Sequence, residues 1–212
     1  KQKINKLISQ VNSFDSEAKL SKLIGEFGAR YLYGMIKTHK FDNPVRPIIS
    51  QCPSPTYLLA KFVNKIITPY CPHTYSLKSS LEFVDLIHGC RQSGIAATMD
   101  VESLFTNVPV RDTISIICNY VYHSDTLPPP KIPESLLHEL LLVCTTESPF
   151  RHLDQSLFLQ IDGVAMGSPL GPTFANFCMG RLEEIAFAEI EETPIVYARY
   201  MDDIFLLVKK NT

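Results

Sequence analysis

The sequence has little net charge, and it lacks several patterns that would assign it to a common class of protein. Its 212 residues carry a formal net charge of −2, so binding to nucleic acid has to depend on local sites rather than on a generally basic surface. It contains no signal-peptide pattern and no run of eighteen or more apolar residues, so we expect no association with a membrane. A Gly-x-x-x-x-Gly-Lys-Ser/Thr phosphate-binding loop is also absent.

Cysteine pairs with zinc-site spacing are missing as well. None of the six cysteines belongs to a Cys-x-x-Cys pair or has a histidine at zinc-finger spacing, which argues against a structural zinc ion. Cysteines scattered through a chain of this length are typical of reduced core residues, so we expect an intracellular protein. They are Cys52, Cys71, Cys90, Cys118, Cys144 and Cys178.

What is present is an ordinary globular composition in which helix and strand patterns are interspersed. Hydrophobic residues make up 45% of the chain, enough for one large domain or two lobes with a sizeable core. Because the strand patterns include an antiparallel hairpin and are mixed with helices, we predict an α+β fold. The predicted helices cover about 1–24, 55–68, 79–88, 110–123, 133–146 and 168–191. The predicted strands cover about 31–40, 45–50, 94–100, 150–153, 156–160, 194–200 and 204–208.

Two of these helices have start signals in the sequence. Ser79 and Glu82 have the spacing of a capping box, which predicts a helix that begins next to Ser79. Ser168 followed by Pro169 predicts the start of the long helix, with the serine as cap and the proline at the first helical position.

Two adjacent aspartates interrupt the apolar residues near the end of the chain. Asp202 and Asp203 stand between the predicted strands 194–200 and 204–208, which places them with Met201 at the tip of a tight hairpin. At this tip both carboxylates can approach one ion, and a divalent cation would offset the repulsion between them. The alternative is that the two aspartates only form a solvated turn.

A third carboxylate, Asp100, ends the predicted strand 94–100. An aspartate at the carboxyl end of a strand is well placed to face the tip of a neighbouring hairpin. Three carboxylates suit two Mg²⁺ ions, which at roughly 3.5–4 Å from each other stabilise the attacking and leaving oxygens of a phosphoryl transfer. Alternatively, Asp100 caps a turn before Val101-Glu102-Ser103.

These carboxylates belong to a set of motifs that resembles the reverse transcriptases. Tyr200-Met-Asp-Asp203 is similar to their paired-carboxylate box, and Asp100 with Phe105 five residues later is similar to their first carboxylate motif. The family's loop-to-helix motif, which lies between these two, is resembled by Gly163-Val-Ala-Met-Gly167-Ser-Pro. Its fingers strand is resembled by Val45-Arg-Pro-Ile48. All four motifs occur in the order of the family.

The finer resemblance is to Penelope-like retroelements, through the segments 33–40, 100–109 and 163–169. It implies a right-hand polymerase with a palm, which is an antiparallel sheet backed by helices, and part of the fingers. It also implies a relationship to telomerase catalytic subunits and a nuclear location. We accordingly expect a helical extension at 1–30, fingers and fingers–palm helices at 31–93, and the palm at 94–212.

The chain begins without methionine and ends soon after the last predicted strand, so we expect it to be a fragment of a longer protein. The resemblance implies that a thumb follows residue 212, and in many members of the group a GIY-YIG endonuclease as well.

The resemblance implies an RNA-directed DNA polymerase that uses divalent metal. Asp100, Asp202 and Asp203 would be catalytic and would hold two Mg²⁺ ions, or Mn²⁺ in their place, with the Val101 carbonyl as a further ligand. The partners would be an RNA template, a DNA primer and deoxynucleoside triphosphates.

Basic residues of the fingers region are candidates for phosphate binding. Arg46 would lie against the triphosphate, because a planar and permanently charged guanidinium suits phosphate oxygens. Lys37 would lie near the γ-phosphate. Together with His39 and Lys40 these two residues form the densest basic cluster of the region.

Other residues would contact the rest of the nucleotide. Phe105 would sit beneath the sugar and exclude a ribose 2′-hydroxyl, which selects deoxynucleotides. Gly163 and Gly167 would let the backbone approach the nucleotide and the template. Tyr200 and Met201 would flank the primer end and the new base. Each of these residues has a plainer interpretation as core, turn or hairpin packing.

Two other functions stay open at this point. One is an RNA-directed RNA polymerase or another palm polymerase, against which Phe105 argues, because such enzymes generally have a smaller or polar residue at this place. The other is a non-catalytic remnant that only binds nucleic acid, against which the three intact carboxylates argue. Met166 departs from the glutamine that many reverse transcriptases carry before the second glycine of the loop, which leaves the contact with the base pair unassigned.

Overall fold

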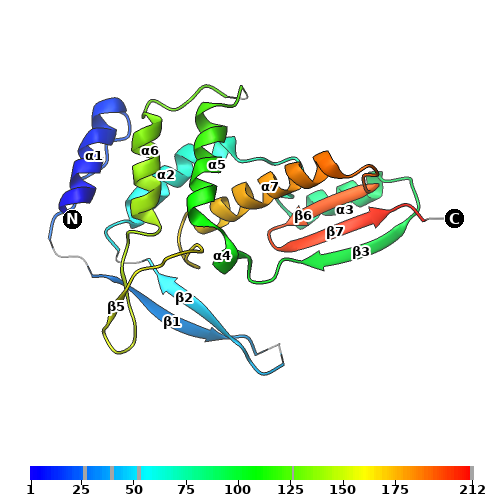
Figure 1. Cartoon of the computed structure of the whole chain (residues 1–212), viewed down its shortest axis with the longest axis horizontal. Coiled ribbons are helices and arrows are strands. Elements are labelled where there is room, and N and C mark those ends of the chain that lie inside the picture. Colours follow the sequence, from blue (N-terminus) through cyan, green and yellow to red (C-terminus); the bar gives the residue numbers. More distant parts are fainter. Residues whose placement is uncertain (26–27, 39–40, 52–53, 126, 211–212) are drawn as a thin grey trace.

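The computed structural model describes residues 1–25, 28–38, 41–51, 54–125 and 127–210, which form two small sheets and a group of helices (Figure 1). The helices are α1 (Gln2–Phe14), α2 (Tyr57–Ile67), α3 (Ser80–Gly89), α4 (Leu104–Asn107), α5 (Val110–Tyr122), α6 (Glu134–Cys144) and α7 (Gly171–Glu189). The strands are β1 (Arg30–Ile36), β2 (Val45–Ser50), β3 (Ile95–Asp100), β4 (Phe150–Arg151), β5 (Leu157–Phe158), β6 (Val196–Tyr200) and β7 (Asp203–Val208).

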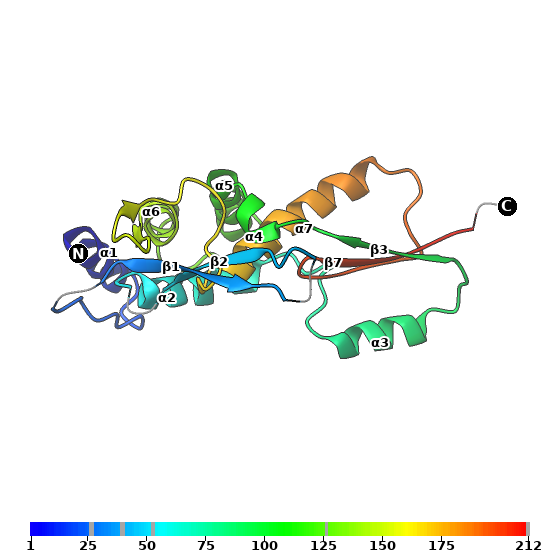
Figure 2. The same ribbon diagram turned by 90° about the horizontal axis from the view of Figure 1, so that it is seen from below.

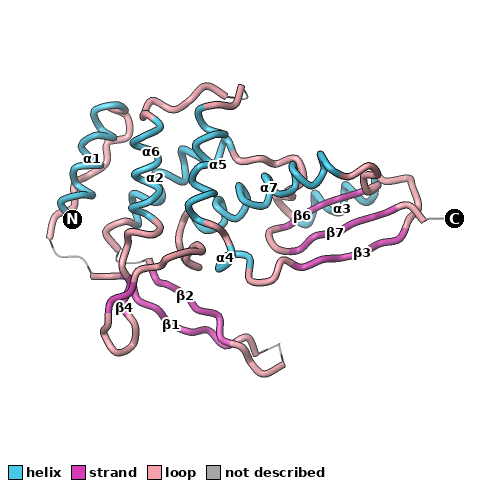
Figure 3. Tube along the Cα trace, in the orientation of Figure 1, coloured by secondary structure: helices cyan, strands magenta, loops and turns pink. Residues whose placement is uncertain are grey.

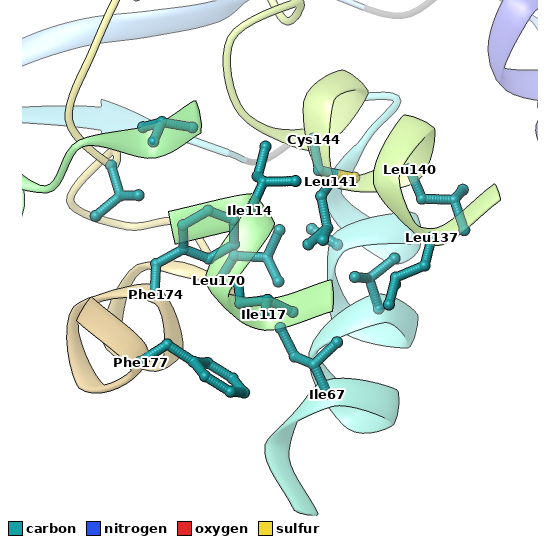
Figure 4. Close-up of a cluster of buried hydrophobic side chains, with 14 of the residues drawn as sticks. Ile67, Ile114, Ile117, Leu137, Leu140, Leu141, Cys144, Leu170, Phe174 and Phe177 are labelled. Atoms are coloured by element: carbon teal, nitrogen blue, oxygen red, sulfur yellow. The ribbon is translucent and has the colours of Figure 1, made fainter. Parts of the chain in front are cut away.

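The hydrophobic core lies among the helices at one end of the molecule. Figure 4 shows isoleucine, leucine and phenylalanine side chains from α2, α5, α6 and the start of α7 pointing toward one another. Ile67, Ile114, Leu137 and Phe174 are fully buried in this cluster. Helix α5 follows the first carboxylate motif and α7 follows the glycine motif, so both motifs adjoin this closely packed body.

The first sheet projects from this helical body as a hairpin. Its order is β2-β1-β4-β5, with β1 antiparallel to β2 over six residue pairs from Tyr31–Ser50 to Ile36–Val45. Strand β4 runs parallel to β1, and the buried Arg30 side chain donates hydrogen bonds to the Thr145 and Ser148 carbonyls after α6. This contact fastens the root of the hairpin to the helices.

The second sheet has the order β3-β7-β6 and lies at the other end of the molecule. Figure 2 shows α7 on one face of this sheet and α3 on the opposite face. Strand β3 is antiparallel to β7, and β7 is antiparallel to β6. The segment before α3 extends the sheet beyond β6, because the Arg199 N–H donates to the Tyr75 carbonyl and the Leu77 N–H donates to the Arg199 carbonyl, both at 2.8 Å.

The α+β architecture predicted from the sequence is confirmed, and so is each predicted strand, with bounds shifted by a few residues. The capping serine is also confirmed, since Ser79 Oγ accepts the Glu82 N–H at 3.3 Å. The short helix α4 was not predicted. The domain boundaries expected at residues 30 and 93 stay predictions.

The first helix is shorter than predicted, ending at Phe14 instead of continuing to about residue 24. Two asparagine side chains hold the segment that follows in an irregular conformation. The Asn12 amide pairs with the backbone N–H and carbonyl of Leu20, and the Asn5 amide pairs in the same way with Leu23. Side chains that bond to the backbone in this manner compete with helix formation.

The prediction that Ser168 caps the long helix is wrong. Helix α7 begins at Gly171 with Pro172 in its first turn, and Leu170 is its N-cap. The preceding residues form a separate turn, in which the Gly171 N–H donates to the Ser168 carbonyl at 3.1 Å and the Leu170 N–H donates to Ser168 Oγ at 3.3 Å. The segment between β5 and α7 is therefore an irregular loop up to Leu170 (Figure 3).

Other sequence expectations concern cysteines and membranes. Within the residues that the structure describes, the five cysteines are free thiols, and four of them are buried. Burial raises the pKa of the Cys144 thiol to about 12 and that of Cys118 to about 11, so both are unreactive. Cys52 lies outside the described residues. Over the same described ranges, the structure has no helix long and apolar enough to cross a membrane.

Candidate active site

The first and the last carboxylate motifs meet across two neighbouring strands. Asp100, the last residue of β3, lies directly opposite Asp203, the first residue of β7. Beyond this pair, the Val101 N–H donates to the Asp202 carbonyl at 2.9 Å, so the two chains stay bonded past the ends of the strands. Asp100 and Asp203 consequently form a pair without mutual backbone hydrogen bonds, in which Cβ atoms lie only about 4.5–5.5 Å apart.

Both carboxylates lie on the face of the sheet that is turned away from α7. Phe205 contacts Phe83 of α3, with ring centroids 5.1 Å apart, so the side chain of Asp203, two residues earlier, is on the α3 side. Ile204, which lies between Asp203 and Phe205 in β7, is buried in the core on the opposite face of the sheet. Asp100, Asp202 and Asp203 are all exposed, so these carboxylates avoid the desolvation cost that an apolar sequence context suggests.

The predicted hairpin tip is present, with Met201 and Asp202 as its two loop residues between the paired Tyr200 and Asp203. Met201 has φ = 58°, in the left-handed region that a two-residue hairpin loop demands and that glycine normally provides. A methionine there costs about 1–2 kcal/mol, so the surrounding contacts have to hold this conformation.

The fit of these residues to a metal ion is incomplete in one respect. Their carboxylate oxygens are the ligands that Mg²⁺ prefers, and the Asp100–Asp203 pair places two of them together. Among the described residues, however, no three His, Cys, Asp or Glu side chains are grouped closely enough to hold a metal ion. The strand register thus brings two carboxylates together, while Asp202 leaves the strand at the turn and its side chain does not complete the group.

A pocket of about 570 Å³ lies between the β1–β2 hairpin, α2 and the glycine loop, which comprises residues 163–169. It brings together Arg46 of β2, Phe105 of α4 and Gly167, which are far apart in the sequence and were all predicted to bind nucleotide. The other residues around it are Ile48, Tyr57, Lys61, Ala165, Met166, Ser168, Pro169 and Pro172. Two cations and a long apolar wall suit a ligand with an anionic end and a flat apolar part.

The glycine loop holds this pocket together because its backbone is bonded both to α4 and to β2. Its Val164 N–H donates to the Phe105 carbonyl at 2.7 Å, and its Met166 carbonyl accepts the Ile49 N–H of β2 at 3.2 Å. A side chain at Gly167 (φ = 103°) would lie 3.1 Å from the Ile49 carbonyl, and one at Gly163 (φ = 71°) would lie 2.7 Å from the Thr106 carbonyl. Both glycines are thus required by close approach to the protein's own backbone, which the sequence interpretation did not foresee.

The remaining predicted residues lie elsewhere. Tyr200 is 51% exposed and lines, with Asp203, a largely apolar cavity of about 660 Å³ between α3 and the sheet. Lys37 follows the end of β1 and is not among the residues that line either cavity. His39 and Lys40 of the predicted basic cluster lie outside the described residues.

Comparison with known proteins identifies the family. The model of the family described as Reverse transcriptase (RNA-dependent DNA polymerase) matches residues 38–212. The chain belongs to this family. No curated protein matches the sequence of this reverse transcriptase domain.

Solved structures share the fold of this reverse transcriptase domain. The apo telomerase of Candida tropicalis, truncated from the C-terminal domain, superposes with a TM-score of 0.60 at 12% identity over 99% of this chain and 49% of its own. The telomerase of Candida albicans in complex with a TWJ fragment of telomeric RNA gives 0.60 at 10% identity over 97% and 42%. The BmCPV RNA-dependent RNA polymerase gives 0.54 at 9% identity over 95% and 19%.

These identities are low enough that the likeness concerns the fold alone. It confirms the predicted right-hand polymerase fold with antiparallel sheets and helices. The chain spans less than half the length of the telomerases that it matches.

The sequence interpretation missed Lys61 as a candidate binding residue of this reverse transcriptase domain. Lys61 lies on α2 one helical turn after Tyr57, and its Nζ is 4.7 Å from the centre of the Tyr57 ring. This contact holds an exposed cation at the edge of the pocket that contains Arg46. An i, i+4 pair of tyrosine and lysine on a predicted helix was the available signal, but it carries no meaning until the helix is known to face the pocket.

Proposed function

We propose that this domain is an RNA-directed DNA polymerase of a Penelope-like retrotransposon, which transfers nucleotides to the 3′-hydroxyl of a primer. The observation that carries the proposal is the pairing of Asp100 with Asp203. Asp100 stands only five residues before Phe105, which lines the same pocket as Arg46. Carboxylates and a cation that can bind phosphate are what nucleotidyl transfer requires.

The carboxylates would hold the metal ions of the reaction. Asp100, Asp202, Asp203 and the Val101 carbonyl are the proposed ligands of two Mg²⁺ ions, with Mn²⁺ as an alternative. Such ions supply charge neutralisation at the attacking and leaving oxygens. The protein's own part is to keep Asp100 and Asp203 in register and to leave Asp202 free on an exposed turn, from which its side chain can turn toward the pair.

The pocket would bind the incoming nucleotide. Arg46 and Lys61 would contact the triphosphate, with Lys37 nearer its γ end, because the first two cations line the same pocket and would neutralise a bound polyanion. Phe105 would face the sugar and exclude a 2′-hydroxyl. Gly167 would let the backbone approach the nucleotide and the template where it lines the pocket, while Gly163 would act through the fold of the loop.

The remaining partners are an RNA template and a DNA primer, and the site of action is the nucleus. Support for nucleic acid as a partner comes from the family and from the telomerase structures, of which the Candida albicans example contains a telomeric RNA fragment. Tyr200 and Met201, at the hairpin that bears Asp202, would flank the primer end.

An RNA-directed RNA polymerase is the competing activity, since the BmCPV polymerase shares the fold. Phe105 favours DNA synthesis, because its ring lines the nucleotide pocket and leaves less room for a ribose. A non-catalytic remnant is disfavoured by the retained register of Asp100 and Asp203, for which a purely structural role offers no reason in view of their charge repulsion.

The test is primer extension on an RNA template by the full-length protein. We expect deoxynucleotide incorporation that requires Mg²⁺ or Mn²⁺ and that is abolished by Asp202→Asn. The control is Asp85→Asn, which removes an exposed aspartate from α3 and should leave extension unchanged. Extension that survives Asp202→Asn, or that uses ribonucleotides equally well, would refute the proposal.

A further inference from the structure

The end of β6 carries a charged side chain that is completely buried. Arg199 is 0% exposed and faces α7, where it meets Glu183, which is 5% exposed. Its Nε donates to Glu183 Oε1 at 2.5 Å and its Nη2 donates to Oε2 at 3.1 Å, so the guanidinium grips the carboxylate with two parallel bonds. The Tyr197 hydroxyl donates to the same Oε1 at 3.0 Å. The buried carboxylate therefore has three donors.

The other arm of the same guanidinium reaches the hairpin turn. Nη1 of Arg199 donates to Asn176 Oδ1 of α7 at 3.0 Å and to the Met201 carbonyl at 3.2 Å. The Arg199 backbone is held as well, because both its N–H and its carbonyl bond to the segment before α3. One planar group thus connects α7 to the peptide between Met201 and Asp202.

We propose that Arg199 is a positioning residue that fixes the turn bearing Asp202, with Glu183 and Asn176 as its support on α7. This inference rests on the proposed function, because it concerns the direction of the Asp202 and Asp203 carboxylates. Met201 is held at φ = 58°, a conformation that persists only when neighbouring contacts enforce it. Its carbonyl is the point at which Arg199 does so.

The contacts continue from the turn to the other carboxylate. The peptide that Arg199 holds leads into Asp202, whose own carbonyl accepts the Val101 N–H next to Asp100. A series of bonds therefore runs from α7 through Arg199 and the turn to the end of β3. Outer contacts of this kind orient metal ligands, and their loss commonly lowers metal affinity about 10–100-fold.

The alternative is that the Arg199–Glu183 pair only attaches α7 to the sheet. Lysine in place of Arg199 separates the two possibilities. Its single ammonium keeps the positive charge opposite Glu183, but it lacks the planar fork that reaches Glu183 and the Met201 carbonyl at once. The matched control is Arg30→Lys, which alters an equally buried arginine that bonds backbone carbonyls at the root of the β1–β2 hairpin.

The experiment observes the turn directly by NMR of methyl-¹³C methionine in this chain, which has only five methionines. We expect Arg199→Lys to shift or broaden the Met201 signal while leaving that of Met35 in β1 unchanged, and Arg30→Lys to do the reverse. In a titration with Mn²⁺ alone, the concentration that halves the Met201 signal should rise about tenfold or more in Arg199→Lys. Asn176→Ala, which keeps the pair with Glu183, should cause a smaller change of the same kind and serves if Arg199→Lys does not fold.

The outcomes are separable. An unchanged Met201 signal in Arg199→Lys and in Asn176→Ala, with only a lower melting temperature, would overturn the positioning role and leave a purely structural pair. If Mn²⁺ does not affect Met201 in the parent chain, the proposed metal site fails, and the methyl shifts of the variants alone still decide whether Arg199 orders the turn.

Discussion

Asp100 and Asp203 face each other across β3 and β7 as a pair of exposed carboxylates on the face of the sheet that is turned away from α7. Like charges directly opposite each other on neighbouring strands are destabilising, by about 0.2–1 kcal/mol. Nothing in the packing of the sheet requires this pair, since neighbouring positions such as Thr98 and Phe205 show that uncharged residues fit the same face. The arrangement is therefore a cost to stability that a bound cation would remove.

This cost leads to a prediction about stability. In metal-free buffer at low salt, Asp203→Asn should raise the free energy of unfolding by about 0.2–1 kcal/mol, because it removes one of two facing charges. Thermal unfolding would show this as an increase of roughly 2–4 °C for each kcal/mol. The increase should shrink in 1 M salt, where the screening length falls to about 3 Å.

Addition of Mg²⁺ should reverse the ranking, because the ion stabilises the parent protein by binding only to its folded state. Asp85→Asn on α3 is the control. Its melting temperature should stay close to that of the parent both without metal and with Mg²⁺. A variant Asp203→Asn that is less stable than the parent without metal would contradict the interpretation of the pair as a repulsive one.

Lys61 gives a prediction about substrate binding. Lys61→Met should raise the KM for the deoxynucleoside triphosphate about tenfold or more, since a charge-assisted bond to phosphate is lost. Lys65→Met removes an exposed lysine from the same helix outside the pocket and should leave the KM unchanged. Steady-state primer extension measures both. Equal effects of the two substitutions would mean that α2 acts only through general charge.

The elements that form the site could be predicted from the sequence because their signals are local. The apolar run up to Asp100 and the two runs around Met201-Asp202 identify β3, β6 and β7 by their periodicity. Their register could not be derived in this way, since it depends on which strands become neighbours. The order of the motifs supplied that information through the family resemblance.

Features that depend on long-range contacts escaped prediction for the same reason. Arg199 stands in a strand pattern and Glu183 in a helix pattern, and each alone looks like a solvated charge. Only the packing of α7 against the sheet makes them partners. The start of α7 was misplaced because Ser168 and Gly171 both offer good local signals, and the turn between them is decided by the loop's attachment to Phe105 and Ile49.

The contrast between a glycine in a left-handed conformation and a glycine with open space around it gives a prediction about stability. Gly167→Ala should lower the free energy of unfolding by about 1–3 kcal/mol, because its φ of 103° is unfavourable for alanine and the new Cβ would lie 3.1 Å from the Ile49 carbonyl. Gly89→Ala at the end of α3 meets no atom within 4 Å and should be neutral or stabilise by about 0.4–1 kcal/mol. Urea unfolding with an unchanged slope would measure both, and a Gly167→Ala protein as stable as the parent would refute the conformational argument.

Phe105 gives the prediction that separates DNA from RNA synthesis. Its ring lines the pocket of Arg46 and lies where a side chain on Gly171 would be 3.4 Å away, so its position is fixed by α7. Phe105→Ala should raise ribonucleotide use relative to deoxynucleotide use by about tenfold or more, because the space for a 2′-hydroxyl opens. The ratio of kcat/KM values in primer extension measures this selectivity.

The same substitution also removes apolar packing, and a general loss of stability could mimic a change in selectivity. Leu104→Ala is the matched control, since Leu104 is the buried neighbour on α4 and its truncation costs about 2–5 kcal/mol without touching the pocket. It should reduce both activities in proportion and leave their ratio unchanged. If Phe105→Ala behaves like Leu104→Ala, the ring has no part in sugar selection, and the preference for deoxynucleotides has to come from another side chain of the pocket.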